Sequence, residues 1–406
     1  MHALRSLRPL ALRKYATSAV NRFQVPAANV AFKGISYSLQ WLRDSCQCPR
    51  CVHPSSRQKL HRTSDIPNDA IADSVRLSDD GIHITWAPGH STFYSADFLE
   101  RYAFSYKLHA FHRDVDPLPW DKPRVQSAPD LFLEYQGLSS PSGLLRALTQ
   151  LTRYGLIFVT GVSPDETSND KCEARRLAQL FAEIRETFYG EMWDVVNVKN
   201  SKNIAYTNLH LGLHMDLLYF QHPPRYQLLH CLRNRVQGGT SVFVDALYAA
   251  NRLQDTHPPD FDVLTKTLVP FHYINNGNHL HHVHPTIELN HEDYIHTGRK
   301  RVQFINYSPP FQAPLPALTP HEFYSALSRF TALLDSPEAA FEYTLREGDA
   351  ILFDNRRILH ARTAFNDLPR SFQNDSEADT TNRWLKGCYL EADKVLNRRR
   401  VLEARL

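Results

Sequence analysis

Apolar and polar residues alternate along this chain with two different periods, and each change of period marks where a helix or a strand is expected. Residues 142–154 and 171–190 carry apolar positions at helical spacing, and Gly190 is expected to close the second helix. The first helix runs into a strand that ends near Gly161. Helices are also expected at 257–268 and 319–336, and short strands at 193–198, 203–209, 226–232, 240–247 and 300–307, with two more that meet at 347–349.

Many short strands with a few covering helices predict a mainly β fold with flanking helices, of the double-stranded β-helix (jelly roll) type. Such a barrel presents side chains from facing strands into its mouth. Residues 75–94 also alternate between apolar and polar positions, which predicts short strands in a small amino-terminal α+β or β domain. Four prolines between residues 114 and 130 are typical of a linker. The expected division is therefore an amino-terminal domain at 23–113, a linker at 114–130 and a catalytic domain at 131–406.

Composition narrows the class of protein. The chain has 406 residues and a net charge of +3, which is too small to indicate a nucleic-acid partner. No stretch approaches the roughly 20 apolar residues of a membrane span. Hydrophobic content of 42% and charged content of 22% are ordinary for a soluble globular protein.

The first 22 residues differ from the rest of the chain. They contain Arg5, Arg8, Arg13, Lys14 and Arg22 and no acid, since the first carboxylate of the chain is that of residue 44. An Arg-rich, Ser-containing, acid-free start is typical of a mitochondrial presequence. The alternative is a basic tail on a cytoplasmic protein.

Three of the six cysteines, Cys46, Cys48 and Cys51, fall within six positions. Thiolates this close repel one another unless a cation lies among them, and zinc binds four tetrahedral sulfur or nitrogen ligands. The pattern therefore predicts a structural zinc site that holds together a domain with little core of its own. Nearby candidates for the fourth ligand are His53, His61, His83 and His90; His90 is favoured because a hairpin can return it to the cysteines.

A second metal site is expected from His214 and Asp216 with the distant His360. Two histidines and one carboxylate form the facial triad that holds Fe(II) and leaves positions open for a co-substrate and O₂. On a strand, His214 and Asp216 would point to the same face, one residue apart. His-x-Asp is common by chance, so the prediction depends on the motifs around it.

Several other residues could have either a functional or a purely structural role. Ser241 follows a Gly238-Gly239 turn, where its hydroxyl would bond a carboxylate or simply belong to a hairpin. Arg383 would bind a dicarboxylate co-substrate or be one surface arginine among many. Residues 279–284, HLHHVH, are expected to form a solvated loop. Four aromatic residues near these motifs would form either a cage for a quaternary ammonium ion or ordinary core: Tyr189, Trp193, Tyr206 and Tyr389.

These motifs together resemble one family. In this order, WLRDSCQCPRC, FYGEMW, NIAYTNLHLGLHMD, PPRYQLLHC, QGGTSVFVDAL, FDNRRILHAR and RWLKGCYLEAD are similar to the γ-butyrobetaine dioxygenases. These are TauD-like oxygenases dependent on Fe(II) and 2-oxoglutarate, a group that also includes the trimethyllysine dioxygenases. The resemblance runs from about residue 41 to residue 402.

The resemblance implies an activity and a role for each of these residues. The activity would be hydroxylation of γ-butyrobetaine to carnitine, with 2-oxoglutarate converted to succinate and CO₂ and with ascorbate as a reductant. Members are commonly homodimers. The implied residues are zinc ligands Cys46, Cys48, Cys51 and His90, iron ligands His214, Asp216 and His360, co-substrate contacts Arg383 and Ser241, the cage of Tyr189, Trp193, Tyr206 and Tyr389, and Asn203 for the substrate carboxylate.

The chain departs from the family pattern between His360 and Arg383, where a long polar loop at 367–382 is expected to bulge into solvent. The mitochondrial-looking leader fits trimethyllysine dioxygenase better, whereas the complete cysteine cluster and PPRYQLLHC fit the butyrobetaine enzyme better. The alternatives are trimethyllysine hydroxylation, an oxygenase of a fungal-type secondary pathway with an uncharged substrate, and a non-catalytic zinc and jelly-roll binding protein.

Overall fold

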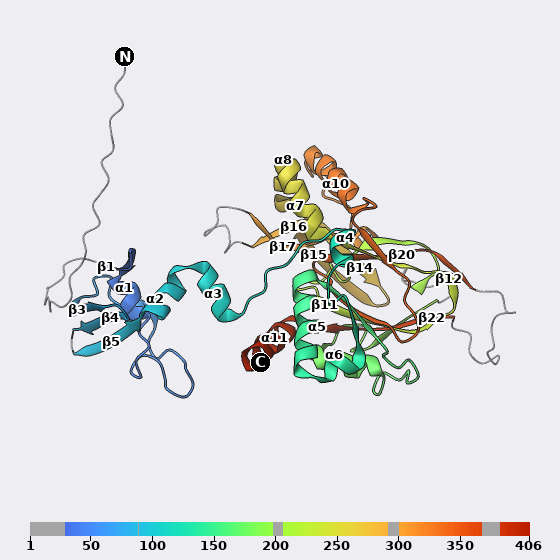
Figure 1. Cartoon of the computed structure of the whole chain (residues 1–406). Coiled ribbons are helices and arrows are strands. Elements are labelled where there is room, and N and C mark those ends of the chain that lie inside the picture. The colour runs from blue at the N-terminus through green and yellow to red at the C-terminus, as the bar shows by residue number, and fades with distance from the viewer. Residues whose placement is uncertain (1–28, 88, 198–205, 291–299, 368–381) are drawn as a thin grey trace, which may run out of the picture. The chain divides into compact units, whose positions relative to one another are not determined.

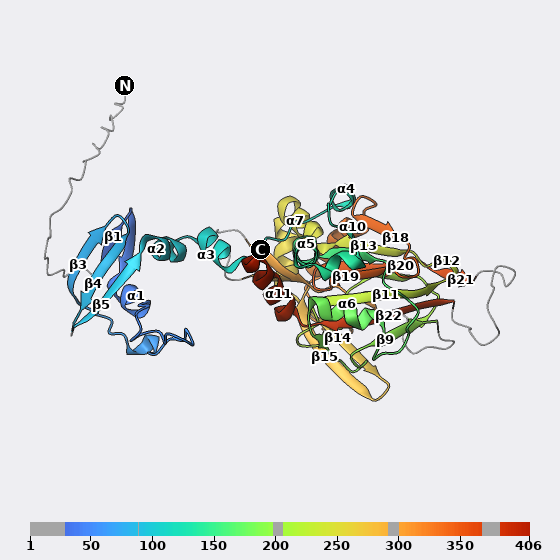
Figure 2. The same ribbon diagram turned by 60° about the horizontal axis from the view of Figure 1, so that its bottom comes forward.

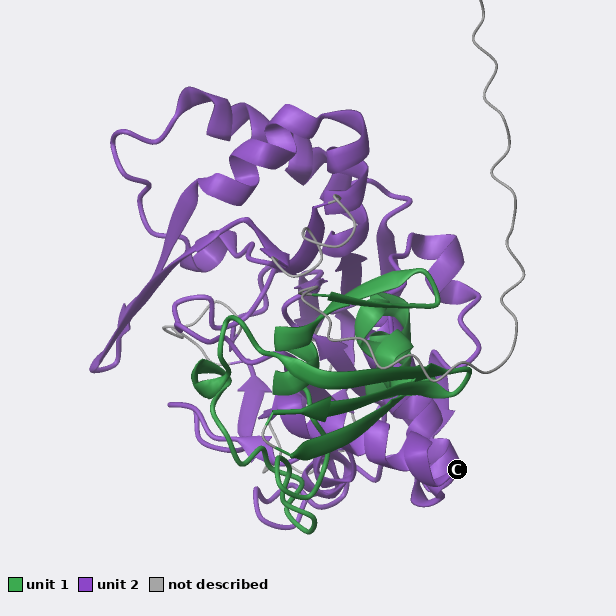
Figure 3. Ribbon diagram, turned by 90° about the vertical axis from the view of Figure 1, so that its left-hand side faces the viewer, with its two compact units in different colours: residues 1–112 green, residues 113–406 purple. Residues whose placement is uncertain are grey.

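The computed structural model describes residues 29–87, 89–197, 206–290, 300–367 and 382–406. The predicted leader, Asn203 and most of the long polar loop lie outside these residues. The chain divides into two compact units, residues 1–112 and 113–406 (Figure 3). The finer domain limits drawn from the sequence stay a prediction. No helix in the described part of the chain is both long and apolar enough to cross a bilayer.

The first unit is built on a three-stranded antiparallel sheet and a hairpin, as the alternation at 75–94 indicates. Ser38 and Ser95 each begin a helix because the side chain accepts a hydrogen bond from the backbone N–H three residues later. The Tyr94 hydroxyl donates to the Leu42 carbonyl and so ties the sheet to the first helix. The elements are β1 (Asn29–Phe32), β2 (Ile35–Ser38), α1 (Leu39–Asp44), η1 (Thr63–Asp65), β3 (Ala72–Ser78), β4 (Gly81–Trp86), β5 (His90–Ser95), α2 (Ala96–Ala103) and α3 (Ser105–His112).

The second unit contains two sheets that face each other (Figure 1). The larger has the order β6-β7-β19-β11-β22-β8, and β9 also pairs with β22. The smaller has the order β10-β20-β13-β18. Their strands are β6 (Phe132–Glu134), β7 (Leu156–Thr160), β8 (Ile184–Arg185), β9 (Trp193–Val196), β10 (Leu211–His214), β11 (Tyr226–Asn234), β13 (Ser241–Asp245), β18 (Ala340–Tyr343), β19 (Ala350–Asp354), β20 (Ile358–Arg362) and β22 (Arg383–Leu390).

Buried aromatic rings fill the space between the two sheets. Phe158 and Phe353 of the larger sheet pack against Phe243 of the smaller sheet, with ring centroids 5.8 and 6.0 Å apart. Side chains of both inner faces therefore form one core, as expected for a jelly roll. The fold class predicted from the sequence is confirmed.

Helices cover the outer face of the larger sheet, where α5 (Pro141–Tyr154), α6 (Glu173–Phe181) and α11 (Ala392–Arg405) bury apolar side chains against it (Figure 1). Ser140 caps α5, and Gly155 ends it in the left-handed region with φ of 75°. A second group packs around the smaller sheet: α7 (Ala246–Thr256), α8 (Pro258–Lys266), η4 (Pro309–Phe311) and α10 (His321–Leu334), with the strand pairs β14 (Leu268–Asn275) and β15 (Asn278–Pro285), and β16 (Ile287–Asn290) and β17 (Arg301–Ile305).

The segment predicted to be a linker is attached to the second unit. Trp120 is fully buried, its indole N–H donates to the Tyr154 carbonyl, and its backbone N–H donates to the Asp245 carboxylate. Asp245 also forms a buried bidentate ion pair with Arg357. A short helix, α4 (Lys122–Gln126), begins at an Asp121 cap within this segment, and η2 (Tyr135–Ser139) follows β6.

Some local predictions were wrong, among them the strand expected at 203–209, whose described residues 206–209 form no strand. The second helix ends at Phe181 instead of running to Gly190, because residues 184 and 185 pair with β22 as the short strand β8. Pairing with a long central strand here overrides helical periodicity. The histidine-rich segment at 279–284 belongs to strand β15, which pairs with β14 in a hairpin that projects from the rest of the unit (Figure 2).

Candidate active site

The two histidines expected to bind iron face each other across neighbouring strands. His214 ends β10, His360 lies on β20, and the two residues are direct antiparallel partners with ring centroids 4.1 Å apart. The Nε2 atoms of both lie 3.7 Å from the carboxylate oxygens of Asp216. One ligand atom from each of the three residues lies within 4.8 Å of the others, so one metal ion can contact all three.

Asp216 does not lie on a strand, contrary to the alternation argument. Strand β10 ends at His214, and the chain turns sharply at Leu217, whose φ is +61°. The carboxylate therefore reaches the two imidazoles from a turn.

The surroundings of the two histidines suit a metal. Burial, and then the neighbouring His214, lower the pKa of His360 to about 3, so its imidazole is neutral at physiological pH. The Nδ1 atom of His214 lies 2.8 Å from the Gly212 carbonyl oxygen, an acceptor that requires the proton to be on Nδ1. The Nε2 lone pair of His214 then points toward Asp216, which is how protein imidazoles are held for metal binding.

The triad lies in a cavity of about 890 Å³, a volume that includes open space at its mouth. Its walls come from both sheets and are mostly apolar, as in most small-molecule sites. Asp216 is the only carboxylate among the described lining residues. The lining also includes Tyr189, Trp193, Tyr206, Leu217, Tyr219, Gln227, Ser241, Phe311, Arg362, Arg383 and Tyr389.

One end of the cavity carries two buried arginines. Arg383 is 5% exposed, its Nε has no hydrogen-bond partner among the described residues, and burial lowers its pKa. Burial, and then the charge of Arg383, lower the pKa of Arg362 to about 10. Ser241 lines the same cavity. A carboxylate placed here would relieve the repulsion between the two guanidinium groups and satisfy Arg383.

The four aromatic residues singled out in the sequence all line this cavity. The Trp193 ring centroid lies 5.4 Å from that of Tyr389 and 6.5 Å from that of Tyr189. The Tyr389 hydroxyl donates to the Asp216 carboxylate at 3.4 Å, which ties this group of rings to the triad. Burial raises the pKa of Tyr206 to about 12, so its hydroxyl stays protonated.

Sequence reasoning missed several lining residues. Arg362 lies two positions after His360 on β20 and so faces the same side, a signal that strand alternation offered. Gln227 is a buried polar residue in the otherwise apolar start of β11. This polar exception in an apolar run could also have been noticed in the sequence. Tyr219 lies in a turn and Phe311 ends the short 3-10 helix η4, and no pattern indicated them.

In the first unit, Cys46, Cys48, Cys51 and His90 gather at one point. The three Sγ atoms lie 3.3, 3.4 and 3.7 Å from His90 Nε2. His90 opens β5 and is thereby returned to the cysteine loop, as the hairpin argument expected. The other three candidate histidines do not join this group; for example, His53 accepts a hydrogen bond from Ser56 N–H and His83 packs on Phe93.

The donor set and its environment suit zinc. Burial raises the pKa of Cys46 to about 11, which disfavours a thiolate unless a cation is present. Burial also opposes ionisation of Cys48, but hydrogen bonds from the Arg50 backbone and from the neighbouring cysteines lower its pKa. Three sulfurs and one nitrogen match the tetrahedral ligand set of structural zinc.

Comparison with known families agrees with this geometry. The model of the "Taurine catabolism dioxygenase TauD, TfdA family" matches residues 121–389, and that of "Gamma-butyrobetaine hydroxylase-like, N-terminal" matches residues 29–100. The chain belongs to the TauD/TfdA dioxygenase family. It is an Fe(II)- and 2-oxoglutarate-dependent dioxygenase, as the sequence resemblance implied.

Relatives within the TauD/TfdA family differ in what they act on. "Dioxygenase str8" of Strobilurus tenacellus is 51% identical over 90% of this chain and 85% of its own length, and its name states no substrate. Human γ-butyrobetaine dioxygenase is 30% identical over 91% of this chain and 92% of its own length. Human mitochondrial trimethyllysine dioxygenase is 28% identical over 98% of this chain and 92% of its own length.

Proposed function

We propose that this chain hydroxylates a trimethylammonium substrate, and that this substrate is γ-butyrobetaine, which is converted to carnitine. The observation that carries the proposal is that four aromatic side chains line the same cavity as the triad and the buried Arg383. A quaternary ammonium ion cannot donate a hydrogen bond, so several π faces around one point are the natural site for it. Relatives of similar identity act on γ-butyrobetaine and on trimethyllysine, both of which carry this group.

In this proposal, different side chains bind the metal and the co-substrate. His214, Asp216 and His360 hold Fe(II), and Arg383 with Ser241 binds the distal carboxylate of 2-oxoglutarate. The bound metal supplies the oxidising chemistry, in which 2-oxoglutarate and O₂ yield succinate, CO₂ and a hydroxylated product. The protein's part is to orient one substrate carbon and to exclude water.

The cage sets which carbon is presented. Tyr189, Trp193, Tyr206 and Tyr389 would surround the trimethylammonium group, and the Tyr389 hydroxyl on Asp216 keeps one cage wall at a constant distance from the triad. The carboxylate contact proposed for Asn203 lies outside the described residues and stays part of the proposal.

Formal charge favours γ-butyrobetaine over trimethyllysine. Among the described lining residues there are two guanidinium groups and one carboxylate, so these residues leave an excess of positive charge after Fe(II) and the 2-oxoglutarate dianion bind. γ-Butyrobetaine is neutral overall, whereas trimethyllysine carries a further ammonium group that would add to the excess. Trimethyllysine hydroxylation remains the second candidate, since the cage alone does not distinguish the two.

The decisive experiment incubates purified protein with Fe(II), 2-oxoglutarate and O₂ and either γ-butyrobetaine or trimethyllysine. We expect a product heavier by one oxygen, with matching succinate, from γ-butyrobetaine at a far higher kcat/KM. If trimethyllysine gives this result instead, the proposed substrate is wrong but the proposed trimethylammonium cage is still supported.

The control is His214→Ala, which lacks one proposed iron ligand and should lose substrate-coupled succinate formation. Near-normal turnover in that variant would contradict the iron assignment. If neither ammonium compound is hydroxylated by the active wild-type protein, the trimethylammonium proposal is wrong and an uncharged substrate becomes the better hypothesis.

We also propose structural zinc on the Cys₃His cluster, a homodimer, ascorbate as reductant and a mitochondrial location. The mitochondrial location is supported by the basic leader and by the trimethyllysine dioxygenases named as mitochondrial.

A further inference from the structure

A buried amide side chain holds the backbone of Asp216 on both sides. Asn355 is fully buried and lies 139 residues further along the chain. Its Oδ1 accepts a hydrogen bond from the Asp216 N–H at 2.8 Å, and its Nδ2 donates to the Asp216 carbonyl at 3.0 Å. The second Nδ2 hydrogen goes to the Pro224 carbonyl, also at 3.0 Å. Both donors of this amide are therefore used, and two of its three bonds go to one residue.

Asp216 depends on this side chain because no strand holds it. Strand β10 ends at His214, and the Met215 N–H already bonds elsewhere, to the Tyr307 carbonyl at 2.9 Å. The next residue, Leu217, is buried and has φ of +61°, a conformation that a branched side chain adopts only where its surroundings impose it. Without Asn355, the Asp216 N–H and C=O would both lose the partners that hold them in this turn.

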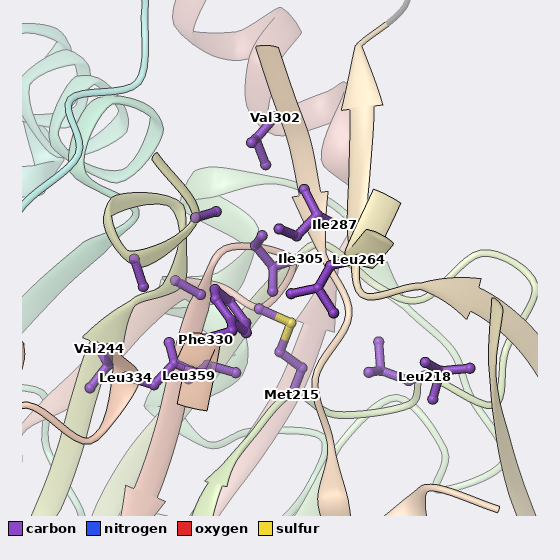
Figure 4. Close-up of a cluster of buried hydrophobic side chains, with 14 of the residues drawn as sticks. Met215, Leu218, Val244, Leu264, Ile287, Val302, Ile305, Phe330, Leu334 and Leu359 are labelled. Carbon is purple, nitrogen blue, oxygen red and sulfur yellow. The ribbon is translucent and has the colours of Figure 1, made fainter. Parts of the chain in front are cut away.

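Packing of the neighbouring side chains also anchors this turn. Met215 and Leu218, which flank Asp216 and Leu217, are fully buried in a cluster with Phe330 and Leu359 (Figure 4). The side chains next to Asp216 are thus fixed by packing, and its peptide groups are fixed by the amide. The carboxylate itself has one further contact, the hydrogen bond from the Tyr389 hydroxyl.

We propose that Asn355 is a positioning residue that aims the Asp216 carboxylate at the metal; this inference rests on the proposed role of Asp216 as an iron ligand. Asn355 lies in the turn that joins β19 to β20, five residues before His360. One turn therefore sets the start of the strand that carries His360 and the backbone of the residue that carries the carboxylate. The two ligands keep their relative position because they share this support.

The chemistry of the amide explains why asparagine is needed. The site requires one acceptor and two donors within a single side chain, and a carboxamide supplies both. Aspartate would lose both donors and turn its oxygens toward two carbonyl groups. Outer residues that orient metal ligands contribute about 10–100-fold to metal affinity.

The test measures Mn(II) binding by the full-length protein, with free Mn(II) followed by electron paramagnetic resonance. Mn(II) suits the oxygen and nitrogen ligands of the triad and not the thiolates of the zinc cluster. We expect Asn355→Ala, and more mildly Asn355→Ser, to weaken Mn(II) binding by about 10–100-fold. The matched control is Gln150→Leu, which removes a buried amide-to-carbonyl bond in α5, away from the cavity; it should change Mn(II) affinity by less than about 2-fold.

A second measurement distinguishes positioning of Asp216 from a purely structural role of Asn355. The Mn(II) affinity of the double variant Asn355→Ala, Asp216→Ala is compared with that of Asp216→Ala alone. If Asn355 acts through Asp216, it should have almost no further effect on affinity there. Wild-type affinity in both Asn355 variants, or an equal loss in both backgrounds, would overturn the positioning role while leaving the proposed function intact. If Asp216→Ala itself binds Mn(II) normally, the iron assignment fails and this inference fails with it. Melting temperatures of the metal-free variants show whether each variant is folded. If Asn355→Ala is not folded, the Mn(II) affinity of Asn355→Ser decides the test.

Discussion

Gly387 leaves the space that the Trp193 indole occupies. The two residues are partners in the antiparallel pairing of β22 with β9, and a Cβ atom on Gly387 would overlap the indole ring. Trp193 is proposed to form one wall of the cage. Gly387 is therefore expected to determine the position of the indole without contacting the substrate. The sequence around RWLKGCYL does not indicate this role, because the contact between Gly387 and Trp193 forms only when the two strands pair.

Gly387→Ala is expected to push the Trp193 ring out of place and raise KM for γ-butyrobetaine by about 10-fold, the scale of a lost cation–π contact. KM for 2-oxoglutarate should change by less than about 2-fold, since the arginine end of the cavity is untouched. Gly137→Ala, at a glycine whose added Cβ meets nothing within 4 Å, is the control. An equal rise in both KM values for Gly387→Ala would contradict the assignment of Trp193 to the cage.

Among the elements, a short strand pair shapes the part of the cavity that is proposed to bind the co-substrate. Strand β12 (Val236–Gly238) pairs with β21 (Phe365–Asp367), and the turn after β12 brings Gly239 against Arg383. Gly239 has φ of +70°, and a Cβ there would lie 3.1 Å from the Arg383 Nε. The turn residues thus limit where the guanidinium group can lie.

Gly239→Ala should displace Arg383 and raise KM for 2-oxoglutarate by about 10–100-fold, the scale of a charged hydrogen bond. The matched control is Gly277→Ala in the β14–β15 turn, where φ is +77° but an added Cβ meets nothing within 4 Å. Both variants strain the backbone, but only the first crowds the arginine. If both raise KM alike, backbone strain and not the position of Arg383 is responsible.

For the whole molecule, the two units are expected to have different sources of stability. The second unit has several large buried clusters, whereas the first has one small core and a cluster of three cysteines and a histidine. A small unit with so little core generally needs a metal or a disulfide. All six cysteines are free thiols, so zinc is the expected support.

Removing zinc from the full-length protein with a chelator should lower the melting temperature of one calorimetric transition by several degrees or more and leave the other unchanged. Cys48→Ser should reproduce the loss without a chelator. Asp216→Ala should not, because its site lies in the other unit. A single transition that is indifferent to chelation in all three proteins would show that the cysteine cluster is not a structural metal site.

The sequence by itself determined the local and chemical features. Helical periodicity marked α5, α8 and α10, apolar runs marked most strands, and close cysteines marked a candidate metal cluster, because each signal lies within a few neighbouring residues. The order of the motifs along the chain made the candidate site residues recognisable, namely His214, Asp216, His360, Arg383 and the four aromatic residues of the proposed cage.

Only the tertiary structure decided how these groups are held. Asn355 meets Asp216 across 139 positions, Gly387 makes room for Trp193 on another strand, and pairing with β22 shortens α6. The Asp216 carboxylate reaches the imidazoles from a strained turn, not along a strand. These contacts join residues far apart in sequence, so their energies depend on which strands pair and in which register, and no local pattern contains that information.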